Sequence, residues 1–538
     1  MAMAQFQMTD GSSKSQNNVV YGLPSSNMKS TTAEGIISTM STGAGQWRNV
    51  YLTFSAHYAY KGKYMADFSV RRDGSTKFGD EYRWGNFPAL SFRWNASDEP
   101  FMKKIKWLSM LSVRPGWGVV GNQPGSEYLY FSRYSNTSSY VDKGAIIPSN
   151  IRLSNLHWEE KETWNVGFDL GLFDNLITAD FNIYTQMTSD LLMANINIPS
   201  SSGFTALSWQ NVGNMRNNGW EFNINGNRII HKGKFSVDFN VTFANNRNEI
   251  TKMDETVLDN LNKDFSYNNG TYLTRIQLNN AFGSIYGFRY KGAYQYSKYS
   301  ETEVPGVSGP NAPVARDENG NVVIDKNGLT VPMVFNYDNT SNTYAYEFKG
   351  GDAIYDDINH DGNINELDIV YLGSSLPKVT GGFGFKINFG NFRWNNQFTF
   401  RAGNKVVNMA RMNAESMYNN RNQSTAVNWR WRVEGDVAQI PRALYNEGYN
   451  YLASDRFVED ASFLRLNYSQ LSYNFDPQLV KKWGLSSLSI NLSAHNLFCL
   501  TGYSGADPEV GYGGLSVSYD NARTPRSRQF TLGVSVMF

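Results

Sequence analysis

A two-residue alternation of apolar and polar side chains is the feature that most limits what this 538-residue chain can fold into. From Val50 to Tyr60, and again from Tyr64 to Val70, every second residue is apolar or aromatic. Successive side chains of a β-strand point to opposite faces, so this period indicates strands with one apolar face and one polar face. The turn at Lys61 and Gly62 separates the two runs, which makes them a hairpin.

The same pattern predicts thirteen strands along the chain. Their ranges are 48–60, 63–73, 86–96, 106–118, 162–173, 176–188, 218–228, 234–245, 380–389, 392–402, 462–475, 487–498 and 526–538. Each is ten residues or longer, whereas strands of soluble sheets usually have about 5–6 residues. This length argues against a soluble β-sandwich or β-propeller, the competing all-β architectures.

The connections between these strands alternate between short turns and long polar loops. The long ones cover 119–160, 190–217, 246–380 and 403–460. A tilted strand crosses a membrane in about 9–11 residues, and outer-membrane barrels combine short periplasmic turns with long extracellular loops. The sequence therefore predicts an all-β fold, a transmembrane antiparallel β-barrel. Its turns near Gly62, Asp174 and Gly233 would face the periplasm.

Composition excludes several other classes of protein. No run of 18 apolar residues is present, which rules out a bundle of transmembrane helices. The net charge of +1, without long blocks of either sign, argues against a nucleic-acid partner. A single cysteine, Cys499, excludes disulfide scaffolds and zinc ribbons.

The two ends of the sequence favour the C-terminal part of a larger barrel. Alternating Phe530, Leu532, Val534 and Val536 lead to a terminal Phe538, an ending similar to the assembly signal of Gram-negative outer-membrane proteins. Bacterial barrels have an even number of strands, but we predict thirteen. We therefore interpret residues 1–47 as the remnant of an extracellular loop and 48–538 as barrel, and expect that the chain cannot close a barrel by itself.

Nine segments of the sequence closely resemble the SusC/RagA family of TonB-dependent outer-membrane transporters from Bacteroidetes. They are residues 68–79, 83–89, 99–102, 162–169, 188–192, 211–221, 455–466, 495–498 and 503–510. This resemblance implies a plugged barrel of 22 strands in the outer membrane, driven by TonB. It implies two further partners, a SusD-like surface lipoprotein and an oligosaccharide or peptide substrate. The sequence contains no recognisable plug, TonB box or signal peptide, so the resemblance also implies a missing N-terminal segment.

One loop has the spacing of a calcium site. Asp357, Asn359, Asp361, Asn363 and Asp368 occupy the positions that supply oxygen ligands in a D-x-N-x-D-G loop, and a glycine stands at its sharp turn. An Asx-rich turn of the same composition can also satisfy its own backbone without a metal. Both interpretations stay open, and no other cofactor is expected.

Aromatic residues in the predicted loops are the other candidates for binding. Tyr128, Tyr130, Tyr134, Phe204 and Trp209 have rings that can stack on sugars, but loop packing explains them equally simply. The substrate-binding residues therefore stay unknown.

An enzyme is not expected. The five histidines are nowhere paired at i, i+4, and no nucleophile elbow or phosphate loop is present. The leading prediction is a component of a SusC-like transporter. A barrel-anchored adhesin or glycan-binding scaffold is the alternative, and an adhesin would not need a plug or TonB.

Overall fold

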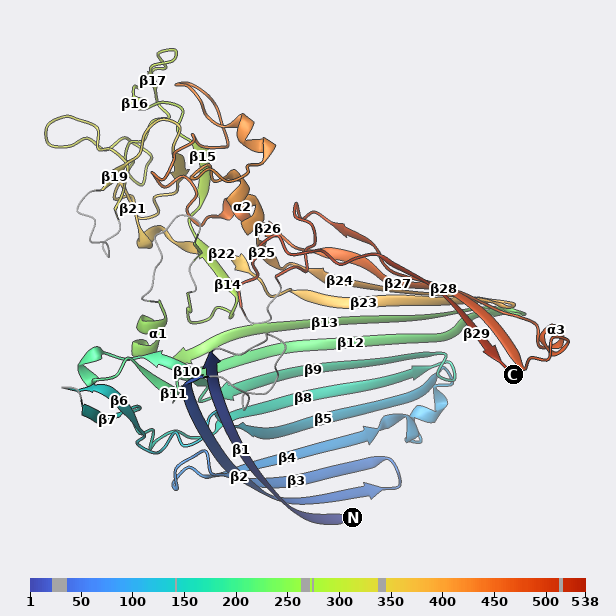
Figure 1. Cartoon of the computed structure of the whole chain (residues 1–538). Helices are drawn as coiled ribbons and strands as arrows, with labels where there is room; N and C mark the ends of the chain where they lie inside the picture. Colours follow the sequence, from blue (N-terminus) through green and yellow to red (C-terminus); the bar gives the residue numbers. More distant parts are fainter. Residues whose placement is uncertain (22–35, 141–142, 263–270, 273–274, 337–344, 512–515) are drawn as a thin grey trace. The chain divides into compact units, whose positions relative to one another are not determined.

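The computed structural model describes residues 1–538 except 22–35, 141–142, 263–270, 273–274, 337–344 and 512–515. Its main element is a sheet of fourteen strands, which follow one another in chain order (Figure 1). The strands are β1 (Ala2–Tyr21), β2 (Ile36–Tyr60), β3 (Tyr64–Ser75), β4 (Trp84–Asn95), β5 (Leu108–Asn122), β8 (Glu159–Leu172), β9 (Ile177–Ser189), β12 (Gly213–Lys232), β13 (Phe235–Met253), β23 (Val379–Phe389), β24 (Phe392–Ala402), β27 (Phe463–Asn474), β28 (Ser487–Thr501) and β29 (Gln529–Met537).

The remaining elements are short and lie in the connections. The strands are β6 (Tyr134–Tyr140), β7 (Lys143–Pro148), β10 (Leu192–Asn197), β11 (Ala206–Asn211), β14 (Ser284–Gly287), β15 (Tyr290–Ala293), β16 (Lys298–Tyr299), β17 (Ser308–Gly309), β18 (Val334–Phe335), β19 (Tyr346–Glu347), β20 (Ala353–Tyr355), β21 (Asn363–Ile364), β22 (Val370–Ser374), β25 (Lys405–Val407) and β26 (Val458–Asp460). The α-helices are α1 (Glu255–Asn262), α2 (Met409–Glu415) and α3 (Pro477–Lys481), and the 3-10 helices are Ala96–Asp98, Met102–Lys104, Ser200–Ser202, Glu366–Asp368, Thr425–Trp429 and Asp455–Phe457. None of the described helices is long and apolar enough to cross a membrane.

A strand of the sheet overlaps each of the thirteen predicted ranges, and most bounds agree within a few residues, but β2 begins twelve residues before the predicted residue 48 and β13 ends eight residues after the predicted residue 245. The prediction of a loop over residues 1–47 is wrong, because β1 pairs antiparallel with β2 from Ala2 opposite Ala56 onward. The second half of β1 is polar and has no regular alternation, which is why the pattern did not reveal it. With fourteen strands instead of thirteen, the parity argument for an incomplete barrel loses its premise.

The chain divides into two compact units. The first comprises Met1–Leu170, Asn182–Asn217 and Thr251–Asn260, and the second comprises Gly171–Phe181, Asn218–Ile250 and Leu261–Phe538. In the first unit, β1 to β5 pair antiparallel. Their strand register aligns Ala56, Phe68, Leu90 and Trp117 in one apolar row.

In the second unit the alternation separates two faces of the sheet. One row of cross-strand neighbours is apolar and runs from β13 to β29 through Val237, Ile387, Trp394, Leu471, Leu492 and Leu532. The adjacent row is polar and consists of Asp238, Lys386, Asn395, Gln470, Ser493 and Thr531. Leu532 is 70% exposed and Leu492 is 50% exposed. A continuous exposed apolar face of this kind indicates a surface made for lipid or for another protein.

The long connections of the second unit fold into a compact body that we call the loop module, residues 284–374 and 403–460. In Figure 1 it gathers beyond one end of β23, β24 and β27. Its core contains Tyr286, Phe288, Tyr355 and Leu452, all 5% exposed or less. Burying each of these large side chains stabilises the module by about 1.5–3 kcal/mol. The loops thus have a hydrophobic core of their own.

Because one face of the sheet is apolar and the other is polar, a charged substitution should change the stability of the sheet differently on the two faces. Leu532→Arg on the apolar face of β29 should destabilise a membrane-inserted sheet by about 2–4 kcal/mol. Thr531→Arg, one residue earlier and on the polar face, should have little effect. The measurement is the heat-modifiable folded band on a gel of purified outer membranes. Equal loss of that band in both variants would contradict the assignment of the two faces.

Candidate functional site in the loop module

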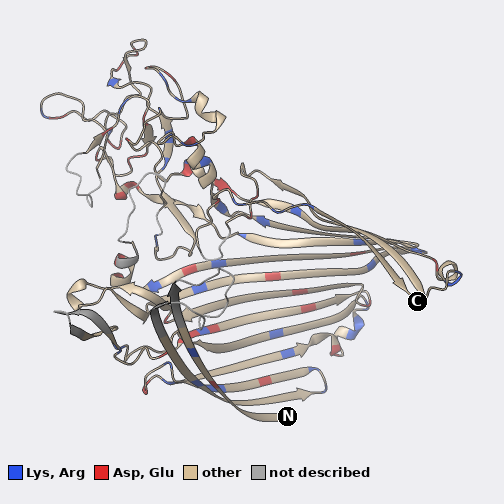
Figure 2. Ribbon diagram, in the orientation of Figure 1, with Lys and Arg blue, Asp and Glu red and all other residues tan. Residues whose placement is uncertain are grey.

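The segment Asp455–Asp460, part of the SusC-like motif, ties the connections of the second unit together. The backbone N–H of Tyr290 donates to Asp455 Oδ1 at 2.8 Å. Arg456 Nη2 donates to Glu415 Oε2 on α2 at 2.8 Å, and both side chains are buried. The N–H of Ser504 in the last long connection donates to Glu459 Oε2 at 2.9 Å. Figure 2 shows acidic and basic residues side by side around α2.

A second buried network joins the two halves of the loop module. Arg442 Nε donates to Asp352 Oδ1 at 2.6 Å and its Nη2 donates to Oδ2 at 3.1 Å. Tyr346 Oη and Asn450 Nδ2 donate to the same carboxylate, which is fully buried. The Arg442 side chain is 26% exposed, so breaking this pair should cost less than about 3–5 kcal/mol, which is typical of a fully buried pair. Such a cost fixes residues 403–460 against residues 284–374.

The last connection, 502–528, is held by a third set of buried charges. Arg465 Nη2 on β27 donates to Asp507 Oδ1 at 2.6 Å, and both side chains are 5% exposed or less. Glu509 pairs with Arg526 at 3.2 Å. The SusC-like segment 503–510 therefore docks a loop onto the sheet.

The predicted calcium loop is an Asx-rich turn whose side chains accept backbone N–H groups. Asp357 Oδ2 accepts from Gly362 N at 2.8 Å, and Asp361 Oδ1 accepts from Asn363 N at 2.8 Å. Asp368 accepts from Ile358 N at 2.7 Å and from Asn365 N at 2.9 Å. Asn359 Nδ2 donates to Asp361 Oδ2 at 2.8 Å. In the described part of the chain, no three His, Cys, Asp or Glu side chains converge as a metal-binding group.

Two other Asx-rich turns of the module form similar hydrogen bonds, but their carboxyl groups have pKa shifts in the opposite direction. Asp317 and Asp325 also accept backbone N–H groups two and four residues ahead. The pKa of Asp317 is lowered first by the Asn321 side chain and then by these backbone groups. The pKa of Asp325 is lowered by the backbone groups of Leu329 and Asn327. Burial instead raises the pKa of Asp357, and it raises that of Asp368 to about 6. Proximity of Asp361 raises both values further. The loop therefore concentrates negative charge that the other two turns do not.

Asn363, whose backbone carbonyl is the predicted ligand, also has an unused side-chain oxygen. Asn363 Oδ1 is buried and has no hydrogen-bond partner, although Asn363 Nδ2 donates to Asn336 O at 3.1 Å. An unpaired buried acceptor beside poorly compensated carboxylates fits a hard cation. The residues present therefore fit Ca²⁺ chemically, and the calcium site stays a prediction.

A pocket of about 600 Å³ opens beside this loop. Tyr294, Tyr296, Arg316 and Asp356 are among its lining residues, together with Asp357. Lys291 Nζ donates to Asp356 Oδ1 at 2.5 Å, and the Tyr296 hydroxyl donates to Glu303, which raises the Tyr296 pKa to about 12. The aromatic and carboxylate side chains of this pocket are those that bind polar ligands.

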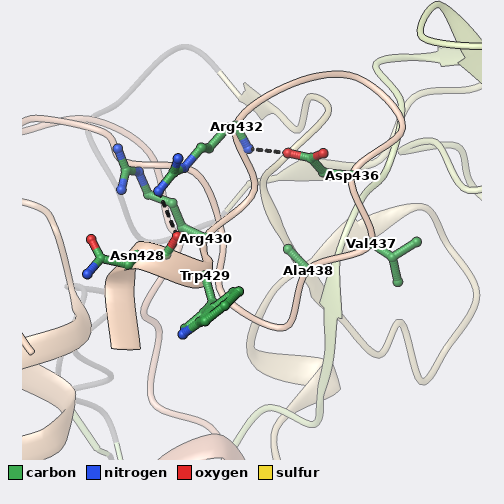
Figure 3. Close-up of a pocket in the computed structure, with 7 residues that line it drawn as sticks. All are labelled: Asn428, Trp429, Arg430, Arg432, Asp436, Val437 and Ala438. Carbon is green, nitrogen blue, oxygen red and sulfur yellow. Dashed lines mark hydrogen bonds between the residues drawn. The ribbon is translucent and has the colours of Figure 1, made fainter. Parts of the chain in front are cut away.

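A second pocket, of about 460 Å³, lies at residues 428–438. Figure 3 shows Trp429, Arg430, Arg432 and Val437 around it. Its residues were not predicted from the sequence. Tryptophan and arginine alternate over residues 429–432, and this repeat could have indicated the pocket. It lies inside a long polar loop, where the strand pattern gives no information.

The structure places the predicted loop aromatics mainly in packing roles. Trp209 packs against a buried cluster that contains Phe78 and Trp158. Tyr128 Oη accepts from Gln46 N at 2.7 Å, and Tyr130 contacts the Phe131 ring at 4.2 Å. Phe204 is partly buried, and Tyr134 is 64% exposed. Loop packing thus accounts for the first three.

Two of the five histidines lie beside carboxylates. His57 Nδ1 lies 2.6 Å from Asp67 Oδ1 on neighbouring strands, and His157 Nε2 lies 3.4 Å from Asp190 Oδ2. Within the described part of the chain, neither ring hydrogen-bonds a serine, threonine or cysteine. Both pairs read as structural contacts.

Comparison with known proteins identifies the family. Residues 3–313 match the family model described as TonB dependent receptor-like, beta-barrel. The chain belongs to this family. A TonB-dependent receptor of Formosa agariphila is 29% identical over 496 residues, and the TonB-dependent receptor SusC of Bacteroides thetaiotaomicron is 28% identical over 494 residues. These matches cover 89% and 90% of this chain but 45% and 43% of those receptors.

The fold is that of the solved RagAB peptide transporter, with a TM-score of 0.73 at 21% identity. The match covers 100% of this chain and 53% of that one. These findings confirm the SusC/RagA resemblance and the all-β barrel fold. TonB-dependent receptors are outer-membrane transporters and in general not enzymes. This chain is accordingly an outer-membrane protein.

The calcium prediction has a direct test in the pH dependence of the loop. A raised pKa means that folded Asp368 holds its proton more tightly than the unfolded chain, so without a cation the loop loses stability as pH rises from 3.8 through about 6. Bound Ca²⁺ would compensate the charge, and its protection should be greatest above pH 6. The measurement is hydrogen exchange of residues 357–368 with millimolar Ca²⁺ or a chelator.

In this experiment Asp361→Ala should abolish the calcium-dependent protection. Asp325→Ala, in the comparable turn, should leave it intact. Exchange that is the same with Ca²⁺ and with chelator in the unmodified protein would establish the metal-free turn.

Proposed function

We propose that this chain forms barrel wall and extracellular loops of a SusC-like TonB-dependent transporter, and that the whole protein imports oligosaccharides or peptides. The observation that carries the proposal is the loop module. Its own hydrophobic core, the buried Glu415–Arg456 pair and the pair of buried Asp352 with half-buried Arg442 hold it beside a sheet with an apolar face. Functional loops held rigidly in this way suit recognition of a substrate.

The partners of the proposed transporter follow from the same family relationship. A SusD-like lipoprotein would cover the extracellular loops, and TonB would act through a plug outside this sequence. The complete barrel would have 22 strands, the size associated with outer-membrane transporters. The chain spans about half the length of the relatives it matches, so the plug and the remaining strands belong to the rest of such a protein. No catalytic step is proposed.

The comparisons do not decide whether the substrate is an oligosaccharide or a peptide. One structural neighbour is described as a peptide transporter, and one relative is SusC. The alternative function is a barrel-anchored adhesin or glycan-binding scaffold. Both functions predict binding at the loops, but only a transporter requires TonB.

Uptake of labelled substrate pools by intact cells tests the proposal. Cells that carry the gene should accumulate compounds from a fluorescent oligosaccharide or peptide mixture. Deletion of the gene should remove that accumulation, and deletion of tonB should remove it while surface binding remains. Deletion of tonB removes only the energy input, so this experiment separates binding from import.

Surface binding without accumulation in unmodified cells would favour the adhesin. Accumulation that survives the tonB deletion would contradict energised transport.

A further inference from the structure

The pocket at residues 428–438 is built on a rigid loop. Trp431 is buried, its indole N–H donates to Gln295 O at 3.2 Å, and its backbone N–H donates to Ile440 O at 2.9 Å. The Trp431 ring packs so closely on Gly351 that a Cβ there would lie 2.3 Å from it. Gly435 N donates to Gln295 O at 2.8 Å. The loop is therefore preorganised before any ligand binds.

The carboxylates of this loop are engaged in holding its backbone. Asp436 Oδ2 accepts from Arg432 N at 2.9 Å and from Val433 N at 3.1 Å (Figure 3). Glu434 accepts from the backbone N–H of Ser297 at 2.8 Å and from its hydroxyl at 2.6 Å. Neither carboxylate forms an ion pair with an arginine in the described part of the chain.

Two guanidinium groups are left without a carboxylate. Arg430 Nη1 donates to Val427 O at 3.1 Å, and Arg432 Nη2 donates to Asn428 O at 2.7 Å. Each group uses a backbone carbonyl and keeps further N–H donors available. Asp436 contributes one negative charge to the pocket against these two positive ones. The charged side chains that line the pocket therefore carry a net positive charge.

An exposed ring stands next to these two groups. Trp429 is 81% exposed and Val437 is 83% exposed, whereas Trp431, two residues along the same loop, is 9% exposed. The exposed indole offers a flat surface for the apolar C–H face of a ring. Guanidinium groups bind planar carboxylates with two parallel hydrogen bonds. The volume of about 460 Å³ lies within the range of small-ligand sites.

We propose that the pocket at residues 428–438 is a binding subsite for an acidic saccharide, whose carboxylate contacts Arg430 and Arg432 while a sugar ring stacks on Trp429. The inference rests on the proposed transport function and narrows its substrate class. A flat protein-docking surface is the competing use of the same residues, but a pocket of this volume with donors at one side and a ring at the other matches a sugar acid better.

Isothermal titration of the purified complete transporter that contains this chain tests the subsite, with trigalacturonate as the probe. Arg430→Ala with Arg432→Ala, and separately Trp429→Ala, should each weaken binding at least about tenfold, which is 1.4 kcal/mol. Arg421→Ala, an exposed arginine of the same loop outside the pocket, should leave binding unchanged. Methyl-esterified trigalacturonate, which lacks the charge, should bind as weakly as trigalacturonate binds the double variant.

The double variant Arg430→Lys with Arg432→Lys keeps both positive charges but removes the planar guanidinium groups. It should recover only part of the affinity, because lysine lacks the planar fork. Equal binding of trigalacturonate by the unmodified protein and the alanine variants would overturn the subsite. Unchanged trigalacturonate binding combined with loss of a co-purifying lipoprotein in those variants would also overturn it and assign the surface to a protein partner.

The outcome is separable from that of the transport proposal. Arginine-dependent binding by the purified protein, together with no TonB-dependent accumulation in cells, would refute transport and leave the subsite standing. TonB-dependent accumulation of neutral compounds without trigalacturonate binding would refute the subsite alone.

Discussion

Backbone hydrogen bonding in lipid is the constraint on which the rest of this structure depends. Each unpaired backbone N–H or C=O in hydrocarbon costs several kcal/mol, so every strand must pair along its length with its neighbours. Antiparallel pairing satisfies this demand and aligns side chains in rows. The row that ends in Leu492 and Leu532 is apolar and exposed, as a lipid-facing row must be, and the adjacent row that ends in Ser493 and Thr531 is polar. The alternation of apolar and polar residues along the sequence follows from this requirement.

Antiparallel order also decides where the functional loops meet. In the second unit, alternate connections emerge at the same end of the strands, so residues 284–374, 403–460 and 502–528 become neighbours. Charge pairs hold them: Asp352 with Arg442 joins the first connection to the second, Glu415 with Arg456 braces the second, and Asp507 with Arg465 docks the third onto β27. A buried charge tolerates no alternative partner without a large desolvation cost. These pairs can therefore fix how the loops pack, which the proposed recognition of a substrate requires.

Strands with a regular alternation of side chains could be predicted from the sequence. Strands and sites that depend on partners distant in the sequence could not. Strands such as Phe392–Ala402 were predicted at their observed bounds, because their side chains alternate throughout. Ala2–Tyr21 was missed, because its polar half is a strand only through pairing with Ile36–Tyr60. The Asp357 loop was found by its spacing. Arg430 and Arg432 were not, because an unpaired guanidinium is recognised only when the engagement of Asp436 and Glu434 is known.

Thiol labelling of intact cells tests the central claim, that the apolar-faced sheet spans the outer membrane with the loop module outside. The experiment places the complete protein in a Cys499→Ser background and adds one cysteine at Val437, 83% exposed in the module, or at Lys234, in the turn between β12 and β13. A membrane-impermeant maleimide should label Val437→Cys in intact cells, and Lys234→Cys only after the outer membrane is permeabilised. Labelling of Lys234→Cys in intact cells as readily as Val437→Cys would contradict the account.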